Sequence, residues 1–218
     1  MPKYLTLFYV IILVVAGGCR EGKKYHDDIE KNAQITSRGA LAEALEFQEA
    51  MNDSFRDPES SPLPDRYRKD FKGLDFFVPD SSYRVMARLV RTPEAEPFLM
   101  PTTTARKSKE VRYGIARFIL KGQPYELELY QSMERQEDSL ERSRLFLPFL
   151  DNTNGETTYA GGRYLDLMIP EGDSIVIDFN KAYNPYCAYN KKYSCPIVPR
   201  VNFLDTEIRA GVKDFVTP

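Results

Sequence analysis

A short, uninterrupted apolar run opens the chain. Residues 4–15 are apolar apart from Thr6, Lys3 stands before them, and the small residues 16–18 follow. A positively charged start, an apolar middle and a small-residue end are typical of a secretory signal peptide. The run is also shorter than the roughly 20 residues that a membrane-spanning helix needs. We therefore predict a signal peptide over residues 1–18.

The pattern then changes twice before the first strand is expected. Residues 19–37 are polar and show no periodicity, which is typical of a flexible tether. Residues 38–55 carry apolar positions at helical spacing, which predicts a helix with one apolar stripe. The residues of that stripe are Leu41, Leu45, Phe47, Met51 and Phe55. A proline-rich stretch ends the helix because proline lacks an amide donor, and a short helical turn is expected near residues 64–71.

From residue 76 onward the apolar positions recur with a period of two, which predicts β-strands. The predicted strands span residues 83–91, 111–120, 124–130, 145–149, 157–169 and 174–180. Turn-forming residues stand between them, so neighbouring strands are expected to pair antiparallel without crossover helices. We expect a mainly β fold, either an antiparallel β sandwich or a partly open barrel with the N-terminal helix. It forms a single domain over residues 38–218.

Two of the predicted hairpins have turns short enough to indicate a register. A four-residue loop at residues 121–124 would place Arg117 opposite Glu128. A second four-residue loop, between the last two predicted strands, would bring Arg163 within reach of Asp178. Because buried charges persist only when they are paired and hydrogen-bonded, we expect an ion pair between Arg163 and Asp178 at the end of an apolar face.

Charge and composition exclude several classes of function. Removing residues 1–18 leaves 29 basic and 32 acidic side chains, a net charge of −3, with no basic stripe for nucleic acid. His26 is the sole histidine, so histidine-based catalysis and a histidine-rich metal site lack their residues. The chain also has no glycine-rich phosphate loop and no glycine-framed serine. We predict no metal, no cofactor and no nucleic acid partner.

Cys19 follows the small residues directly, and this arrangement resembles the lipobox of bacterial lipoproteins. In that motif the thiol is diacylated and becomes the new N-terminus, and two acyl chains give stable membrane anchoring. Here Ala16 stands where the motif usually has leucine, and ordinary secretion with Cys19 as a spare thiol is the alternative. Arg20 resembles outer-membrane sorting signals. We expect a lipid-anchored protein of the cell envelope, held at the outer membrane on its periplasmic side or at the surface.

Seven stretches of the chain form a further pattern. They are residues 57–63, 101–104, 148–155, 162–166, 178–189, 193–196 and 208–213. Together they resemble the bacterial and archaeal domain-of-unknown-function family 1684 (DUF1684), most specifically through the motif from Asp178 to Pro196. The chain departs from the family motif at Val198, where a proline is usual. The resemblance implies no activity, because the family has no established one to carry over.

Cys187 and Cys195 flank a loop rich in tyrosine and asparagine. In an oxidising envelope, a disulfide that closes this loop is one interpretation, and the short loop would gain roughly 2–3 kcal/mol from it. A pair of buried thiols is the second interpretation, and a metal or redox site is the third.

Four charged residues form a second candidate group: Asp151, Arg163, Asp166 and Asp178. Carboxyls in different environments can act as acid and base, and an arginine can hold a carboxylate or phosphate through two hydrogen bonds. The alternative is a structural network that ties hairpin ends together, with Asp151 capping the turn that follows it.

The third group lies in the loop after the last predicted strand: Asn180, Tyr183, Asn184 and Tyr189, together with Tyr186 and Asn190. Aromatic faces beside amide groups are suited to sugars and peptides, but the same residues can form a hydrogen-bonded loop without a ligand. The leading hypothesis is a module that binds an unknown small molecule or protein. The alternatives are a hydrolase-like enzyme that uses the carboxylates with Arg163 on an envelope substrate, and a purely structural lipoprotein.

Overall fold

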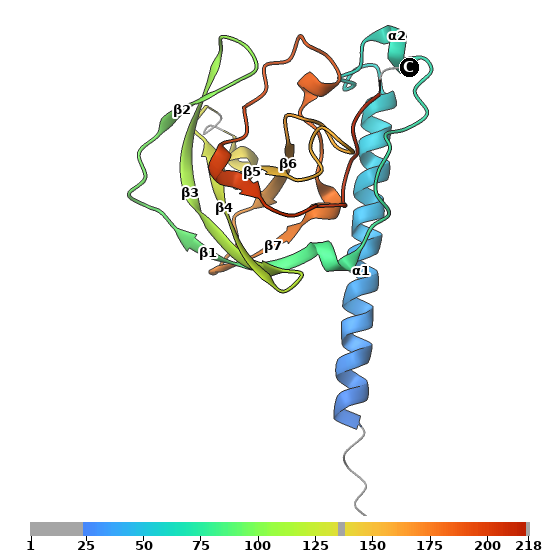
Figure 1. The fold of residues 1–218 in the computed structure, drawn as a ribbon, viewed down its shortest axis with the longest axis vertical. Coiled ribbons are helices and arrows are strands. Elements are labelled where there is room, and N and C mark those ends of the chain that lie inside the picture. The colour runs from blue at the N-terminus through green and yellow to red at the C-terminus, as the bar shows by residue number, and fades with distance from the viewer. Residues whose placement is uncertain (1–23, 135–137, 217–218) are drawn as a thin grey trace, which may run out of the picture. The chain divides into compact units, whose positions relative to one another are not determined.

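The computed structural model describes residues 24–134 and 138–216 (Figure 1). Cys19 and the predicted signal peptide lie outside the described residues. The chain divides into two units, Met1–Thr36 and Ser37–Pro218. In the first unit the described residues, 24–36, are all helical. The second unit holds the sheet and the candidate site.

Helix α1 spans Lys24–Arg56 and therefore begins within the stretch that was predicted to be irregular. The prediction of non-helical chain over residues 24–37 was wrong, because lysine, glutamate, glutamine and alanine favour helix even without an apolar stripe. Among the described residues no helix is long and apolar enough to cross a lipid bilayer.

The face that α1 buries within the second unit overlaps most of the predicted apolar stripe, since Phe55 is buried and Leu41, Phe47 and Met51 are half-buried. Ala40, Ala44, Gln48 and Phe55 are buried, at the spacing of one helix face. Leu45, a member of the predicted stripe, is 55% exposed. The small side chains of Ala40 and Ala44 allow α1 to pack closely on its neighbours, whereas Leu45 lies outside this contact.

Eight strands form one curled sheet, a half-barrel, which confirms the predicted mainly β fold in its partly open form (Figure 1). The strands are β1 Arg84–Arg91, β2 Phe98–Pro101, β3 Lys107–Leu120, β4 Gln123–Ser132, β5 Arg144–Asp151, β6 Arg163–Met168, β7 Ser174–Asp178 and β8 Phe203–Leu204. The order across the sheet is β6-β5-β4-β3-β1-β7, with β2 on β3 and β8 parallel to β5. Short helices α2 (Asp65–Arg68) and α3 (Ser139–Arg142) lie in the connections.

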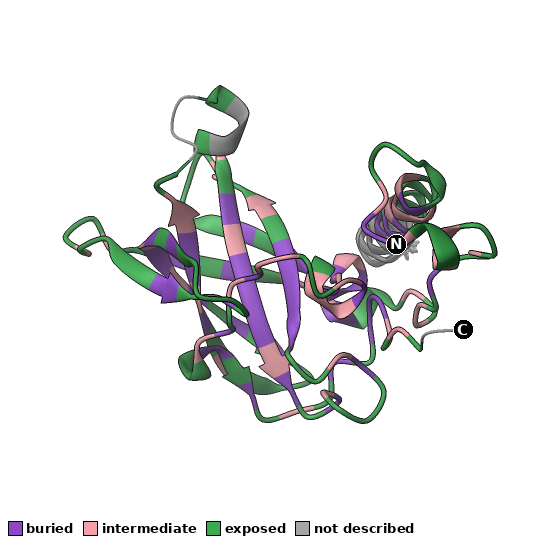
Figure 2. Cartoon of the chain, turned by 90° about the horizontal axis from the view of Figure 1, so that it is seen from above, coloured by how far each residue is buried: buried purple, intermediate pink, exposed green. Residues whose placement is uncertain are grey.

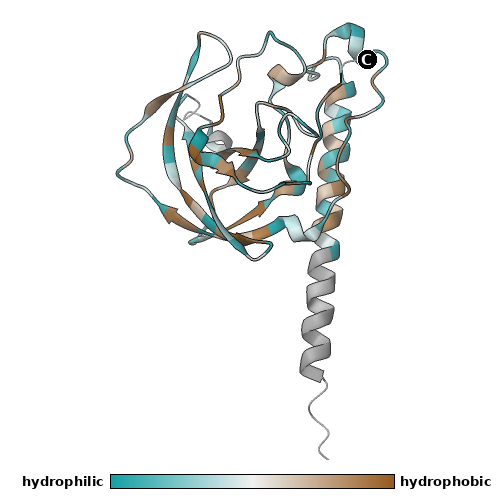
Figure 3. Cartoon of the chain, in the orientation of Figure 1, coloured by the Kyte–Doolittle hydropathy of each residue, from teal (hydrophilic) through white to brown (hydrophobic). Residues whose placement is uncertain are grey.

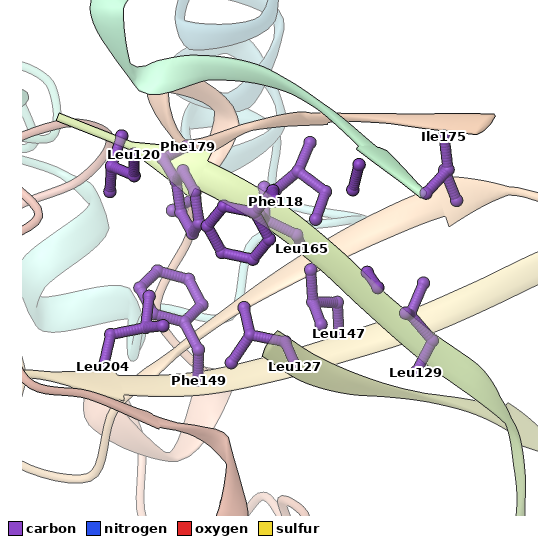
Figure 4. Packing of buried hydrophobic residues seen from close by; sticks show 14 of the residues in the cluster. Phe118, Leu120, Leu127, Leu129, Leu147, Phe149, Leu165, Ile175, Phe179 and Leu204 are labelled. Carbon is purple, nitrogen blue, oxygen red and sulfur yellow. The ribbon is translucent and has the colours of Figure 1, made fainter. Parts of the chain in front are cut away.

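The main hydrophobic core fills the inward face of the curled sheet. Figure 4 shows Phe118 and Leu127 of β3 and β4 packed together with Phe149 of β5 and Phe179, which follows β7. Buried residues are concentrated along the strands (Figure 2), and hydrophobic and hydrophilic residues alternate along them (Figure 3). Alternation of this kind leaves one face of each strand for the core and the other for a second, outward surface.

A β-bulge between Arg112 and Gly114 divides β3 into two halves that face opposite ways. After the bulge, Ala116 and Phe118 belong to the inward core. Before it, Glu110 lies opposite Ser132 of β4 and shares the outward face, because directly paired residues point to the same side. Without the extra residue, strict alternation would place Glu110 in the core.

The predicted register of both hairpins needs correction. At the β3–β4 turn, Leu120 pairs with Gln123 and Arg117 pairs with Glu126, so the loop has two residues instead of four. Lys121 has a φ of 50° there, which suits a tight turn that matches the twist of the strands.

The second predicted hairpin does not exist. β6 pairs with β5, and β7 pairs with β1 at the opposite end of the sheet. Asp178 therefore lies beside Arg84 of β1, and the predicted pair between Arg163 and Asp178 is wrong. The alternation of apolar and polar residues predicted both strands, but it does not determine which neighbouring strand each of them pairs with.

The open seam between the two ends of the sheet is bridged by the chain that follows β7. Tyr164 of β6 and Tyr183 exchange both backbone hydrogen bonds, at 2.9 and 3.0 Å. This bridge fixes the start of the tyrosine-rich loop against the edge strand β6, and it brings that loop to the outward face.

Candidate functional site

A cleft of about 590 Å³ opens on the outward side of the sheet. Its walls come from β3 to β6, from the C-terminal part of α1 and from the loop between residues 183 and 196. We call it the tyrosine cleft, because its lining includes Tyr164, Tyr183, Tyr186 and Tyr193. Its volume falls in the range of roughly 300–1,000 Å³ that is usual for ligand pockets.

Glu110 is the most enclosed carboxyl of the tyrosine cleft, at 3% exposure. Its Oε1 accepts a hydrogen bond of 2.5 Å from the hydroxyl of Ser108, also on β3. Its Oε2 is buried and has no hydrogen-bond partner among the described residues. Burial raises the pKa of Glu110, the charge of Glu134 adds to this rise, and the Ser108 hydroxyl and Arg106 oppose it. An unpaired buried oxygen costs roughly 1–3 kcal/mol, so it marks a position where a ligand group would be stabilising.

Asp166 of β6 lies in the same cleft but in a different environment. It is exposed, and its carboxylate accepts a hydrogen bond of 2.9 Å from the Tyr183 hydroxyl. Burial and the neighbouring Asp166 raise the pKa of Tyr183 well above its usual value, so this hydroxyl keeps its proton and donates a hydrogen bond to the carboxylate. Of the second predicted group, Asp166 is the member that lines the cleft.

Arg106 closes one end of the cleft with several hydrogen bonds. Its Nη1 lies 3.2 Å from Glu134 Oε2, and its Nε and Nη2 donate to the hydroxyl and carbonyl of Ser194 at 3.4 and 3.3 Å. Arg144 of β5 lines the cleft as well. Phe47 and Met51 of α1 and Phe146 of β5 add apolar surface, so the cleft is lined by both charged and apolar side chains.

Cys187 and Cys195 lie together as free thiols. The amide of Cys187 donates to Cys195 Sγ at 3.2 Å, and Cys195 also lines the tyrosine cleft. The hydrogen bond from Cys195 lowers the pKa of Cys187 to about 6, with Thr103 and Tyr159 contributing. The same bond and burial raise the pKa of Cys195. Groups of three or more metal-binding side chains are absent from the part of the chain that the structure describes.

Arg163 and Asp151 form a buried ion pair outside the cleft. Arg163 is 0% exposed, and its Nη2 lies 2.8 Å from Asp151 Oδ2. Arg163 also donates to the carbonyls of Ile208, Ala210 and Val212. The pair thus holds the C-terminal segment in place, and Arg163 has no route to a substrate. The structural interpretation of these two residues is the one that the geometry supports.

Asp151 also caps the turn that follows it, as the alternative interpretation predicted. Its Oδ1 accepts from the amide and the hydroxyl of Thr153, at 2.9 and 2.5 Å, and from the amide of Ile208 at 3.1 Å. Asp178 has a similar role, because it accepts from the amide of Asn180 at 3.1 Å and lies 3.5 Å from Arg84.

The third predicted group separates into structural residues and cleft residues. Asn180 binds both the amide and the carbonyl of Asp80 through its side chain, each at 2.9 Å. Asn184 donates to the carbonyl of Lys213 at 2.9 Å. Tyr189 packs edge-on against Phe55 of α1, with ring centroids 4.7 Å apart. These three residues hold the loop, whereas Tyr183, with Tyr186, lines the cleft.

The cleft residues that sequence reasoning missed are Ser108 and Glu110 of β3 and the arginines at 106 and 144. The predicted strand began at residue 111, whereas β3 begins at Lys107, so residues 108 and 110 lay outside the predicted strand and were assigned no role. Their burial depends on α1 and on the loop after residue 183, which come from distant parts of the chain. A glutamate in register with core residues was the available signal, since it requires either a bulge or an unusual buried acid.

Comparison with known proteins identifies a matching family and a similar solved structure. Residues 69–213 match the model of a family described as a protein of unknown function, DUF1684. The solution NMR structure of an uncharacterized protein from Haloarcula marismortui is similar, with a TM-score of 0.61 and 31% sequence identity. That match covers 88% of this chain and 97% of the other. No curated protein matches. The family model spans well over half of the sequence, and the chain therefore belongs to the DUF1684 family of proteins of unknown function.

Proposed function

We propose that this protein is a lipid-anchored binding protein of the cell envelope that holds a small molecule in the tyrosine cleft. The leader over residues 1–18 and Cys19 directly after it support the anchor, and Arg20 supports the outer membrane as its location. In this proposal the partners are the membrane, through the lipid, and the small molecule. Nucleic acid is not among them, since the mature chain has a net negative charge.

One observation carries the binding proposal, namely the unpartnered Oε2 of Glu110. Buried polar groups are nearly always hydrogen-bonded, so an exception in the wall of a cleft indicates a missing partner. Tyrosine rings and the apolar wall from α1 would cover the remainder of a ligand. Polar groups that fix the orientation of a ligand, beside aromatic and apolar walls that cover it, are usual in a small-molecule site.

A screen of small molecules against the full-length protein in detergent tests this proposal. Ligand-observed NMR would use small sugars, amino acids, aromatic amines and aromatic acids. We expect Tyr186→Ala to weaken the binding of any hit about tenfold, which is roughly 1.4 kcal/mol, because a ring that lines the cleft is lost. Tyr67→Ala, in α2 and outside the cleft, is the control and should leave affinity unchanged. The proposal fails if nothing binds, or if both variants bind like the wild type.

A hydrolase-like enzyme is the second candidate, and one observation favours it. Glu110 is enclosed with a raised pKa, and Asp166 is exposed, so the same cleft holds two carboxyls in different environments. Such a pair can serve as acid and base. Turnover of a bound molecule that is abolished by Glu110→Gln would favour the enzyme over the binding protein. Arg163 has no part in either candidate, because it is buried away from the cleft.

A further inference from the structure

The charges that line the tyrosine cleft favour one kind of ligand. Three carboxyls, Glu110, Glu134 and Asp166, face two guanidiniums. Arg106 is occupied by Glu134 and Ser194, and Asp166 accepts the hydroxyl of Tyr183. Glu110 is left with a neutral serine hydroxyl as its hydrogen-bond donor. A cationic group is therefore the missing complement at this position.

Four tyrosine rings of the cleft lie in two edge-to-face pairs. Tyr164 and Tyr183 meet at 88° with centroids 5.9 Å apart, and Tyr186 and Tyr193 meet at 61° with centroids 5.2 Å apart. Neighbouring rings that stand edge to face form walls in different directions. The negative ring faces that a partner ring does not cover are groups that attract organic ammonium ions.

We propose that the ligand of the tyrosine cleft is an organic amine in its ammonium form, with an N–H that donates to Glu110 Oε2 while its carbon skeleton lies against the tyrosine rings. This inference rests on the proposed binding function and specifies its ligand class. A quaternary ammonium has no N–H and would leave Oε2 unpartnered. An anionic ligand would bring a further negative charge beside three carboxyls.

The electrostatic surroundings of Glu110 agree with this ligand. Burial and the charge of Glu134 hold the pKa of Glu110 above its usual range. A bound ammonium would stabilise the ionised carboxylate and so offset that effect of burial. A hydrogen bond between two charged groups is about twice as strong as one between neutral groups, so the amine gains more than an alcohol at the same position.

Three probes of similar shape and different charge test the inference on the full-length protein in detergent. They are 2-phenylethylammonium, 2-phenylethanol and phenylacetate, each titrated by calorimetry. We expect the ammonium ion to bind at least tenfold more tightly than the alcohol, and phenylacetate to bind most weakly. Glu110→Gln should remove this tenfold preference and change the affinity for the alcohol by less than about twofold. Glu126→Gln changes an exposed carboxylate on β4 that is not part of the cleft, and it should leave the preference intact.

The possible results separate the two proposals. If the alcohol or phenylacetate binds as tightly as the ammonium ion, or the preference survives Glu110→Gln, the ammonium assignment is overturned and the binding cleft stands. If the ammonium probe does not bind while a sugar or an aromatic acid of the NMR screen does, the ammonium assignment again fails by itself. If no probe and no molecule of the screen binds, the proposed binding function fails as well. The wild-type comparison of the three probes is decisive even if Glu110→Gln does not fold.

Discussion

Arg163 and Glu110 are both almost completely buried, yet their surroundings indicate different roles for them. Arg163 has a carboxylate partner and three backbone carbonyls as acceptors, although its Nε has no partner among the described residues. Glu110 has one hydroxyl and an oxygen without a partner. A buried charge beside an opposite charge is part of the structure, whereas an unpaired buried carboxyl in a cleft is the feature on which the proposed ligand site rests. The presence of an opposite charge beside Arg163, and the position of Glu110 in the wall of the cleft, distinguish the two roles.

The buried ion pair gives a prediction for stability. Arg163→Met should lower the free energy of unfolding by about 3–5 kcal/mol, because it leaves Asp151 charged and enclosed without its cation. Urea denaturation of the purified protein measures this loss. Arg163→Met combined with Asp151→Asn should cost less than the sum of the two single changes, since both members of the pair are then neutral.

The control for this prediction is Arg117→Met, which removes an exposed partner of Glu126. Exposed ion pairs contribute roughly 0–1 kcal/mol, so this variant should unfold close to the wild-type urea concentration. Equal losses for Arg163→Met and Arg117→Met would show that the buried pair has no special part in stability.

The thiol pair gives a prediction for pH dependence. A thiolate reacts with iodoacetamide and a thiol does not, so the alkylation rate of Cys187 should rise through about pH 6 and level off above it. Cys195 is buried and has a raised pKa, so it should react much more slowly. Mass spectrometry of the labelled peptides follows both residues.

Cys195→Ala tests the cause of that low pKa. The variant removes the hydrogen bond that stabilises the Cys187 thiolate, so the midpoint of the rate profile should move up toward the ordinary thiol value of about 8.5. A wild-type profile that is already centred near that value would contradict the prediction.

At the scale of elements, the β3–β4 turn shows how a local rule can be right about a turn and wrong about its length. The sequence Lys121-Gly122 was placed in a four-residue loop, but a two-residue turn is formed, with φ values of 50° and 79°. The lysine is the unusual residue there, and its Nζ donates to the Tyr83 hydroxyl at 2.6 Å. A contact to a distant residue thus compensates a backbone conformation that the lysine would otherwise avoid.

Gly122→Ala should destabilise the protein by about 1 kcal/mol, because alanine resists a positive φ that glycine adopts freely. The effect is purely one of backbone conformation, since an added methyl group at this position would meet no neighbouring atom within 4 Å. The midpoint of thermal unfolding measures the change.

Gly172→Ala is the matched control, because Gly172 also has open space around it but has no positive φ. We expect this variant to unfold at the wild-type temperature or slightly above it. If the two alanine variants unfold at the same temperature, the positive φ of Gly122 is not what matters for stability.

The strands themselves could be predicted, whereas their partners could not. A period of two places each residue on one face of a strand, and this property is local to the sequence. Pairing depends on the curl of the whole sheet, which sends β6 and β7 to opposite ends although they follow one another in the chain. The predicted pair between Arg163 and Asp178 failed for this reason.

The residues of the candidate site also divide into those that local sequence predicts and those that depend on distant parts of the chain. Tyr183 and Asp166 could be identified from their residue types, because tyrosine and carboxylate chemistry is typical of binding sites. Glu110 could not, since its position depends on a bulge in β3 and on cover from α1 and the loop after residue 183. Sequence alone therefore located part of the cleft lining and missed the residues that β3 contributes.

At the scale of the whole molecule, the curled sheet separates two tasks between its two faces. The inward face is closed by an apolar core, and the C-terminal segment is fixed there by Arg163. The outward face carries the polar residues of the tyrosine cleft. Cleft-lining residues such as Tyr186 can therefore vary without disturbing the main core, so variants at such positions should retain the wild-type fold.

Anchoring of the whole protein depends on Cys19 in the proposed function, and it can be tested directly. Bacteria that express the full-length chain in the presence of a fatty acid with a clickable group should label the wild type and not Cys19→Ser, because an acyl chain needs the thiol of residue 19. Cys187→Ser removes a cysteine of the folded domain and should label like the wild type. Mass spectrometry of the native protein should then find Cys19 as the N-terminal residue with two acyl chains attached. Label on Cys19→Ser, or a native protein that retains Met1 and an unmodified Cys19, would remove the lipid anchor from the proposal and leave the tyrosine cleft to be judged by its own experiments.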